Sequence, residues 1–211
     1  MREDGEKYVP KCVAGPVNLR IDDFANCGLI LKIGCDTIKS ANRNFGRKIM
    51  NIELKELTHE DIALASRIDR SDISENFVDN LNTIMEYTDY GIEHGCIGHT
   101  FVIKKNDVYI GLIMLGEAIE WETDPPEMKS EPFYRLMGFV IDKKYRGKGI
   151  GGEALEMAIA EVYKDFGVRP IALGCHKENE PAAKFYIKHG FKKTKYMEQN
   201  DIYYLRYPER Y

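Results

Sequence analysis

The amino-acid sequence predicts an α/β fold of three layers, in which helices cover a mixed β-sheet. Three observations support this fold class. A strand-like run, Leu136–Asp142, leads into a glycine-rich turn and then into apolar residues at helical spacing. Two earlier strand-like runs are separated by only three residues, as in a hairpin, and two further runs near the carboxyl end form a second pair. Strands thus alternate with helices and also pair locally.

The first predicted elements are a strand at Ile52–Leu57 and a helix that begins at a capping box. Thr58 and Asp61 have the capping-box spacing, and the helix should run through Ile68. A second helix is expected over Ser74–Tyr87, because apolar residues recur on one face. That face consists of Phe77, Leu81, Ile84 and Met85. The glycines expected in the loop after it are Gly91, Gly95 and Gly98.

A hairpin and a further strand form the predicted centre of the sheet. The hairpin strands are Phe101–Lys104 and Val108–Leu115, joined by Lys105-Asn106-Asp107. Phe133–Ile141 supplies the strand before the glycine-rich turn.

The remaining elements follow from glycine, proline and apolar positions. Gly167 should end the helix after the turn, and Ile171–Gly174 reads as the next strand. Pro181 suits the first turn of a helix that Gly190 closes. The last two strands are expected to pair antiparallel because they are rich in aromatic and β-branched residues; they are Phe191–Met197 and Ile202–Arg206.

The turn at residues 145–155, YRGKGIGGEAL, predicts a site for an anion. Its glycines can adopt positive φ and let backbone amides approach a ligand; they are Gly147, Gly149, Gly151 and Gly152. The helix that follows directs its free N–H groups and its positive dipole end at the same ligand. The net charge of the chain is -4, so the local cations Lys143, Lys144, Arg146 and Lys148 stand out. The ligand should carry phosphate or pyrophosphate.

Two other glycine-loop interpretations are rejected. The string Gly147-x-Gly149-x-x-Gly152 fits a dinucleotide-binding fingerprint, but the acidic residue expected about 20 positions on is replaced by Ala172. Only about 60 residues follow, too few for the remaining βα units. A nucleotide-hydrolysing P-loop needs lysine and a hydroxyl residue after its last glycine, and Glu153 follows here.

The pattern Arg146-x-x-Gly149-x-Gly151 resembles the pyrophosphate loop of the GCN5-related N-acetyltransferases. A second block, Asn179–Tyr186 followed by His189-Gly190-Phe191, is similar to another signature of that family. The resemblance spans about residues 50 to 207. It implies the GNAT fold, a mixed and mostly antiparallel sheet with two splayed strands. It also implies acetyl-coenzyme A as the cofactor, or coenzyme A after transfer, and a primary amine of a small molecule as the acceptor.

The resemblance also assigns roles to residues. Main-chain groups of Phe139, Val140 and Ile141 would hold the pantetheine arm and stabilise the thioester oxygen. The pyrophosphate would lie on the turn formed by Arg146, Gly147, Lys148, Gly149, Ile150, Gly151 and Gly152. Asn179 and Tyr186 would complete the cofactor site, and Tyr186 would protonate the departing thiolate as a general acid.

The general base is where the sequence departs from its relatives. Polyamine acetyltransferases of the family carry an acidic residue nine positions before the loop arginine, and Met137 stands there. Glu117, Glu120 or Glu131 could accept the amine proton directly or through water, and the choice stays open. The missing acid also leaves open a different class of function, a non-catalytic acyl-coenzyme A sensor.

The acidic segment 117–131 points to a cationic substrate, and an ordinary solvated loop is the alternative. It contains Glu120, Glu122, Asp124 and Glu127 against the single cation Lys129. Trp121 could offer a cation-binding face, and Pro125-Pro126 predicts an extended or turning backbone. The resemblance is closest to the bacterial spermine and spermidine acetyltransferases, with aminoglycoside and streptothricin-type acetyltransferases next.

Composition limits the remaining possibilities. With 211 residues and 44% hydrophobic content, one well-buried domain is expected, at residues 50–211, after an extension at 1–49. That extension could add to the sheet, form a homodimer contact or cover the acceptor cleft, and its basic residues are too few to predict nucleic-acid binding. No apolar run reaches membrane-spanning length and no secretory signal is recognised, so no membrane partner and a cytoplasmic location are expected.

Cysteine and histidine patterns predict neither disulfides nor a metal. The five cysteines, an odd number without a C-x-x-C pair, read as reduced thiols; they are Cys12, Cys27, Cys35, Cys96 and Cys175. No two histidines have the spacing that a helical zinc site needs.

Overall fold

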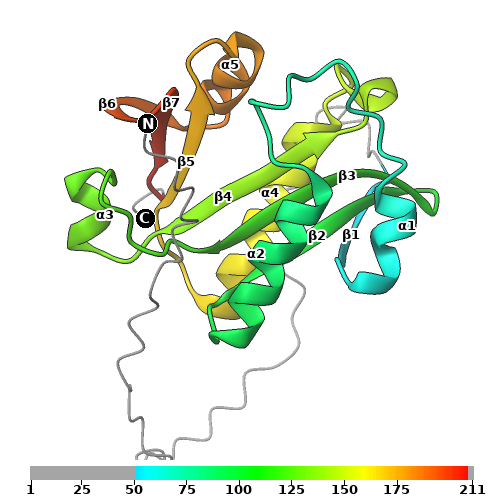
Figure 1. Cartoon of the computed structure of the whole chain (residues 1–211), viewed down its shortest axis with the longest axis horizontal. Coiled ribbons are helices and arrows are strands. Elements are labelled where there is room, and N and C mark those ends of the chain that lie inside the picture. The colour runs from blue at the N-terminus through cyan, green and yellow to red at the C-terminus, as the bar shows by residue number, and fades with distance from the viewer. Residues whose placement is uncertain (1–50, 209–211) are drawn as a thin grey trace, which may run out of the picture. The chain divides into compact units, whose positions relative to one another are not determined.

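The computed structural model describes residues 51–208, which form a seven-stranded mixed sheet with helices on both faces (Figure 1). The strands are β1 (Glu53–Glu56), β2 (Gly98–Lys105), β3 (Val108–Glu117), β4 (Tyr134–Ile141), β5 (Ile171–His176), β6 (Lys192–Glu198) and β7 (Asp201–Arg206). Their spatial order is β1-β2-β3-β4-β5-β7-β6, and only the β4–β5 pair is parallel. The predicted mixed, mostly antiparallel α/β fold is confirmed. The extension at 1–49, with its predicted homodimer contact, lies outside the described residues.

The helices form the outer two layers. They are α1 (Ile62–Ala65), α2 (Leu81–Glu93), α3 (Pro126–Ser130), α4 (Ile150–Phe166) and α5 (Glu180–Lys188), with short 3-10 turns at His59–Asp61 and Lys143–Tyr145. One apolar cluster joins α1 and α2 to Val102, Leu112 and Val140 of the sheet. A larger cluster joins α4 and α5 to the opposite face, and Figure 1 shows α2 in front of the sheet and α4 behind it. None of the described helices is long and apolar enough to cross a membrane.

Helix α4 has the buried stripe that its sequence predicts. The buried residues are Ile150, Ala154, Leu155, Ala158, Ile159 and Val162. Each large apolar side chain buried in this way contributes roughly 1.5–3 kcal/mol. Gly167, with φ +88°, ends the helix as expected. The rigid core therefore fixes the amino end of α4, where the glycine-rich turn enters.

The second helix begins later than predicted. It was expected over Ser74–Tyr87 but spans Leu81–Glu93, because Asn80 caps it by accepting a hydrogen bond from the Thr83 N–H (3.1 Å). Phe77 therefore lies before the helix, and Gly91 lies within it. The capping box of Thr58 and Asp61 is present, but α1 ends at Ala65 rather than Ile68.

Two loops also differ from the prediction. The hairpin between β2 and β3 turns on two residues, Asn106 and Asp107, both with positive φ, and Lys105 belongs to the strand. Pro125 has the extended backbone that was expected (φ -52°, ψ 146°), but Pro126 begins the short helix α3, which was not predicted.

The strands β4 and β5 pair only where they begin. Tyr134 pairs with Ile171 and Arg135 with Ala172, and residues 136–141 have no partner on β5. A bulge bends β4 at Gly138, whose φ is +58° and where a Cβ would lie 2.3 Å from Ile84 Cδ1 of α2. The two strands diverge visibly in Figure 1. The splay leaves main-chain groups of β4 free toward the gap.

Candidate functional site

The glycine-rich turn ends in an uncapped helix terminus. Gly147 (φ +71°) and Gly149 (φ +84°) have positive φ, and Gly149 is the N-cap residue of α4 without a side-chain cap. The first N–H groups of this 17-residue helix therefore face outward with the positive end of its dipole. A Cβ at Gly147 would meet nothing within 4 Å, so its backbone conformation, not crowding, favours glycine. This arrangement fits a pyrophosphate group.

The other two glycines of the turn serve packing instead. Gly151 and Gly152 belong to α4 and do not have positive φ, unlike the prediction for all four glycines. A Cβ at Gly152 would lie 2.6 Å from the ring of His189, which follows α5. Gly152 therefore allows α5 to approach α4 closely.

Arg146 is held in place rather than mobile. Its Nε donates to the Ile141 carbonyl (2.6 Å), and its two terminal nitrogens donate to the two oxygens of Asp72 (2.8 and 3.0 Å). Lys143 likewise pairs with Asp69 (2.8 Å). Two of the four local cations of the turn are therefore paired with carboxylates of the segment before α2.

Tyr186 lies on α5 beside the gap between β4 and β5. Its ring makes edge-to-face contacts with Phe185 and Phe191, with centroids 5.3 and 5.6 Å apart. Burial raises the pKa of Tyr186, and Cys175 nearby raises it further. Among residues 51–208, no hydrogen-bond partner for its hydroxyl is found. The phenol thus stays protonated and has its proton available for donation.

Asn179 and Phe139 lie on the same side of the sheet as Tyr186. Asn179 caps α5 because its side-chain oxygen accepts a hydrogen bond from the Ala182 N–H (3.2 Å). The side-chain NH₂ of Asn179 takes no part in this cap. The Phe139 ring lies 5.8 Å from that of Phe185. Phe139 and Tyr186 thus pack against the same apolar cluster as helix α4.

The carboxylates predicted as the general base are not brought to Tyr186. Glu117 pairs in register with Tyr134, at the start of β4, and lies 3.7 Å from Arg169. Arg169 follows the carboxyl end of α4, about 25 Å along the helix from its amino end. Glu120 and Glu131 are exposed on the segments that flank α3. Their catalytic role stays an untested prediction, and the geometry points elsewhere.

Trp121 and Asp124 are used within the fold. Arg135 contacts both oxygens of Asp124 (2.9 Å each), and both residues are buried. The guanidinium lies 3.8 Å from the centre of the Trp121 ring. Trp121 therefore binds a cation of the protein itself, which corrects the expectation that this face receives the substrate.

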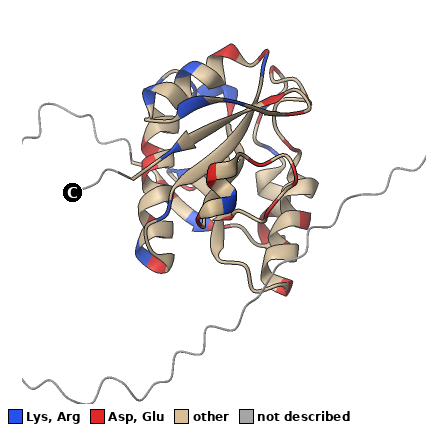
Figure 2. Cartoon of the chain, turned by 90° about the vertical axis from the view of Figure 1, so that its left-hand side faces the viewer, with Lys and Arg blue, Asp and Glu red and all other residues tan. Residues whose placement is uncertain are grey.

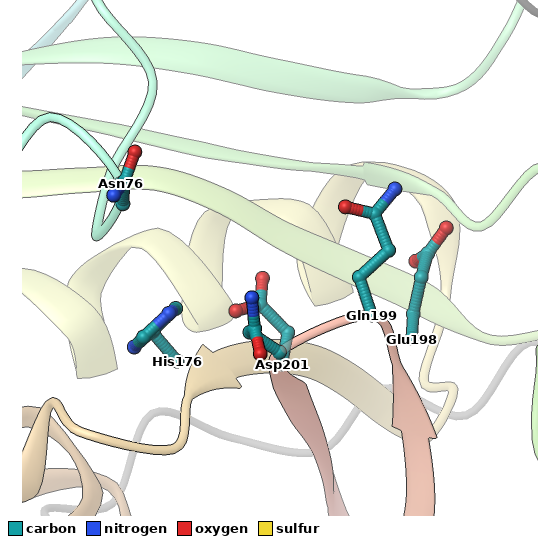
Figure 3. Close-up of a pocket in the computed structure, with 6 residues that line it drawn as sticks. Asn76, His176, Glu198, Gln199 and Asp201 are labelled. Atoms are coloured by element: carbon teal, nitrogen blue, oxygen red, sulfur yellow. The ribbon is translucent and has the colours of Figure 1, made fainter.

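A cavity of about 350 Å³ opens at the carboxyl end of β5, on the opposite face of the sheet from Tyr186. Its lining residues are Asn76, His176, Glu198, Gln199, Asn200 and Asp201. Figure 3 shows His176 and Asp201 side by side, with Asn76 on the facing loop. Sequence reasoning did not select this site, although the acidic hairpin Glu198–Asp201 was the available signal.

The cavity has a negative character. Two of its lining residues are carboxylates, and none is lysine or arginine. Glu198 lies 3.2 Å from the Tyr203 hydroxyl, which is also 3.0 Å from Asp124. Burial raises the pKa of Asp201, Asp79 raises it further, and His176 opposes the shift. On the side of the molecule that Figure 2 shows, acidic and basic residues are interspersed. The cavity therefore favours a small cation.

Other site chemistry is limited in the described part of the chain. Between residues 51 and 208 no group of three or more histidine, cysteine or acidic residues could hold a metal ion. Cys96 and Cys175 form no disulfide, and burial raises the pKa of Cys175 to about 11, so its thiol is a weak nucleophile.

Comparison with known proteins places the chain in an acetyltransferase family. Residues 67–191 match the model of the acetyltransferase (GNAT) family. Among similar solved structures is the PaiA N-acetyltransferase of Thermoplasma acidophilum in complex with coenzyme A, with 19% identity, a TM-score of 0.53, and coverage of 75% of this chain and 100% of that one. An N-acetyltransferase of Staphylococcus aureus Mu50 has 18% identity, a TM-score of 0.52, and coverage of 74% and 97%. A chimeric SpeG spermidine N-acetyltransferase built from Vibrio cholerae and hSSAT has 15% identity, a TM-score of 0.51, and coverage of 73% and 93%.

Proposed function

The chain belongs to the acetyltransferase (GNAT) family, and on that premise we propose that its acceptor is a primary amine of a small cationic molecule, with a polyamine as the favoured substrate. As a member of this family it is an acetyl-coenzyme A-dependent N-acetyltransferase. The observation that carries the substrate proposal is the cavity beside β5, which is lined by Glu198 and Asp201 and by no lysine or arginine.

The residues present fit the acetyl donor. The positive φ of Gly147 and Gly149 and the free N–H groups of α4 suit its pyrophosphate. The stretch of β4 after Arg135 has no partner on β5, and its main-chain groups on that edge would hold the pantetheine arm. When bound, the donor supplies an activated acetyl thioester. Tyr186 would protonate the sulfur, and a main-chain N–H of Phe139, Val140 or Ile141 would stabilise the thioester oxygen.

The size of the cavity favours a slender amine. A volume of about 350 Å³ lies near the lower end of the usual range for small-molecule sites. A polyamine chain fits such a space and places several ammonium groups near carboxylates. A multi-ring aminoglycoside or a streptothricin-type antibiotic, the alternative acceptor, would need more room.

The test is release of free coenzyme A from acetyl-coenzyme A with a panel of spermine, spermidine, diamines, aminoglycosides, streptothricin-like amines and peptides. We expect turnover with polyamines and little with the bulkier amines. Bound coenzyme A with no turnover across the panel would contradict the proposal and favour an acyl-coenzyme A sensor.

A charge variant makes the test specific to the cavity. Glu198→Gln should raise the KM for spermidine about tenfold with little change in kcat, because it removes ground-state attraction. Glu122→Gln, on an exposed position of the acidic segment, is the matched control and should not change KM. A larger increase in KM for Glu122→Gln than for Glu198→Gln would indicate that the acceptor binds at the acidic segment instead.

A further inference from the structure

We propose, building on the proposed function, that Asp201 is the general base that takes a proton from the acceptor amine, and that Gly174 leaves the space in which this amine lies. Neither residue was selected from the sequence.

Asp201 lies where three neighbouring strands, β5, β7 and β6, border the cavity. It is the first residue of β7, and it lies opposite His176 of β5 and opposite Glu198 of β6. Directly opposed residues of antiparallel strands share one face, so the three side chains project together toward the cavity that they line.

The Asp201 carboxylate stabilises no other group through a hydrogen bond or ion pair in the described part of the chain. It is half-buried, yet no hydrogen bond or ion pair from residues 51–208 satisfies it. A carboxylate withdrawn from water without such partners is costly to keep ionised, and such groups concentrate at functional sites. Burial accordingly raises the pKa of Asp201. The unmet charge suits an incoming ammonium group.

Gly174 explains how an amine can reach this carboxylate. It lies within β5 but is exposed, and its φ is not in the left-handed region, so the backbone conformation does not require glycine. A Cβ at this position would lie 3.4 Å from Asp201 Cβ and 3.5 Å from its Oδ2. Glycine inside a strand often marks a place where a ligand approaches closely. Here the missing side chain leaves the surface beside the carboxylate open.

The alternation of β5 puts acid and base on opposite faces. Leu173 and Cys175 face the cluster that contains Tyr186, whereas Ala172 belongs to the cluster on the other face, with Tyr203. Gly174 and His176 follow Ala172 at the strand period of two and face the cavity. The Tyr186 phenol and the Asp201 carboxylate therefore lie on opposite faces of the sheet beside β5.

This placement gives a balanced reaction. Asp201 takes one proton from the ammonium, and the freed nitrogen lone pair forms the C–N bond. The C–S bond breaks with its electron pair on sulfur, which takes the Tyr186 proton. The nitrogen sheds its second proton, which restores the Tyr186 hydroxyl through water, and Asp201 returns its proton to solvent. One proton is released for each amide formed from an ammonium.

His176 is the neighbouring alternative, and its geometry argues against it. The Glu178 N–H points at His176 Nδ1 (3.3 Å), so the neutral ring carries its proton on Nε2 and has no free lone pair for the amine. The ionisable groups that lie opposite Asp201 or interact with it electrostatically are His176, Asp79, Glu198 and Cys175. These groups can also titrate and change the rate with pH. Substitution of Asp201 alone separates its contribution to the pH profile from theirs.

The kinetic test compares Asp201→Asn with Asp107→Asn, a change at an exposed residue of the β2–β3 turn. With an amine that the wild-type protein acetylates, Asp201→Asn should lower kcat/KM by about 100-fold to 1000-fold and remove the acid limb of the pH profile, since general bases usually contribute on this scale. Asp201→Glu should restore part of the rate and the limb. Unaltered kinetics in Asp201→Asn would overturn the assignment while leaving the acetyltransferase function intact.

A binding test does not depend on turnover. Gly174→Ala should weaken calorimetric binding of spermidine to the coenzyme A-bound protein at least tenfold and leave the affinity for coenzyme A unchanged, with Gly91→Ala in α2 as the control. Equal spermidine affinity in Gly174→Ala would show that the amine lies elsewhere. If the wild-type protein neither binds nor acetylates any amine of the panel, the substrate proposal itself fails, and this inference fails with it. Thermal melting of each variant verifies that it is folded.

Discussion

Arg146 on the turn before α4 forms a two-point ion pair with Asp72, which lies on the segment between α1 and α2. The same segment is tied to the turn a second time, where the Asp69 N–H donates to Asp142 (2.9 Å) and Lys143 pairs with Asp69. It then continues to Asn76 at the cavity and to Phe77, whose ring lies 5.1 Å from that of His176. The glycine-rich turn and the cavity proposed for the acceptor are therefore connected through one segment.

This connection predicts that a positive charge at position 146 is not enough for full coenzyme A affinity. Arg146→Lys should weaken coenzyme A binding about threefold to tenfold, because lysine cannot bridge both oxygens of Asp72 and the Ile141 carbonyl at once. Calorimetric titration measures the affinity, and Arg67→Lys on an exposed position serves as the control. An unchanged dissociation constant in Arg146→Lys would remove the bridge from the account of the donor site.

The two ends of α4 offer a matched pair of glycine variants. Gly149 has φ +84° and Gly167 has φ +88°, so a valine at either position should cost roughly 1–3 kcal/mol of stability through backbone strain. Only Gly149→Val should also weaken coenzyme A binding, by more than tenfold, because its side chain obstructs the approach to the helix terminus. Denaturant unfolding and titration separate the two effects. Equal affinities in the two variants would contradict the anion site.

Tyr186→Phe should lower kcat by about ten-fold to a thousand-fold and leave coenzyme A affinity nearly unchanged. Because burial raises the pKa of Tyr186, its hydroxyl stays protonated above the usual tyrosine pKa of about 10, so the rate of the wild-type protein should not fall through ionisation of this group near pH 10. Steady-state kinetics over pH test both statements. Tyr207→Phe, an exposed tyrosine, is the control, and equal rates in wild type and Tyr186→Phe would exclude the acid role.

Asp124→Ala should destabilise the protein by about 3–5 kcal/mol, because it leaves the buried Arg135 guanidinium without its carboxylate. Urea unfolding measures the loss. Glu127→Ala, at an exposed position of α3, should have a small effect. A small effect of Asp124→Ala as well would reopen the interpretation that this segment serves the substrate rather than the fold.

The glycine-rich turn and the helix after it could be predicted from the sequence because their signals are local. A turn that needs glycine at 147 and 149, followed at once by an apolar stripe of helical period, depends on neighbouring residues only. The second helix was misplaced because the capping residue Asn80 outweighs the apolar spacing of Phe77 with the helix. Local patterns also did not reveal α3.

The proposed acceptor site could not be predicted in the same way, because its parts come from distant segments. Asn76, His176 and the β6–β7 hairpin meet only after the sheet takes the order β4-β5-β7-β6, which places the last strand pair next to β5. The acidic segment 117–131 drew the substrate hypothesis by composition alone. Its buried aspartate and its tryptophan are instead partners of Arg135.

The most direct test of the account is where the acceptor binds. Spermidine should be titrated into ¹⁵N-labelled protein saturated with coenzyme A, and the backbone amide shifts followed by NMR. We predict that the largest shifts occur at Gly174–His176 and Glu198–Asp201, with smaller ones near Asn76. Shifts concentrated at residues 117–131, or the absence of any shift, would contradict the assignment of the cavity beside β5 as the amine site.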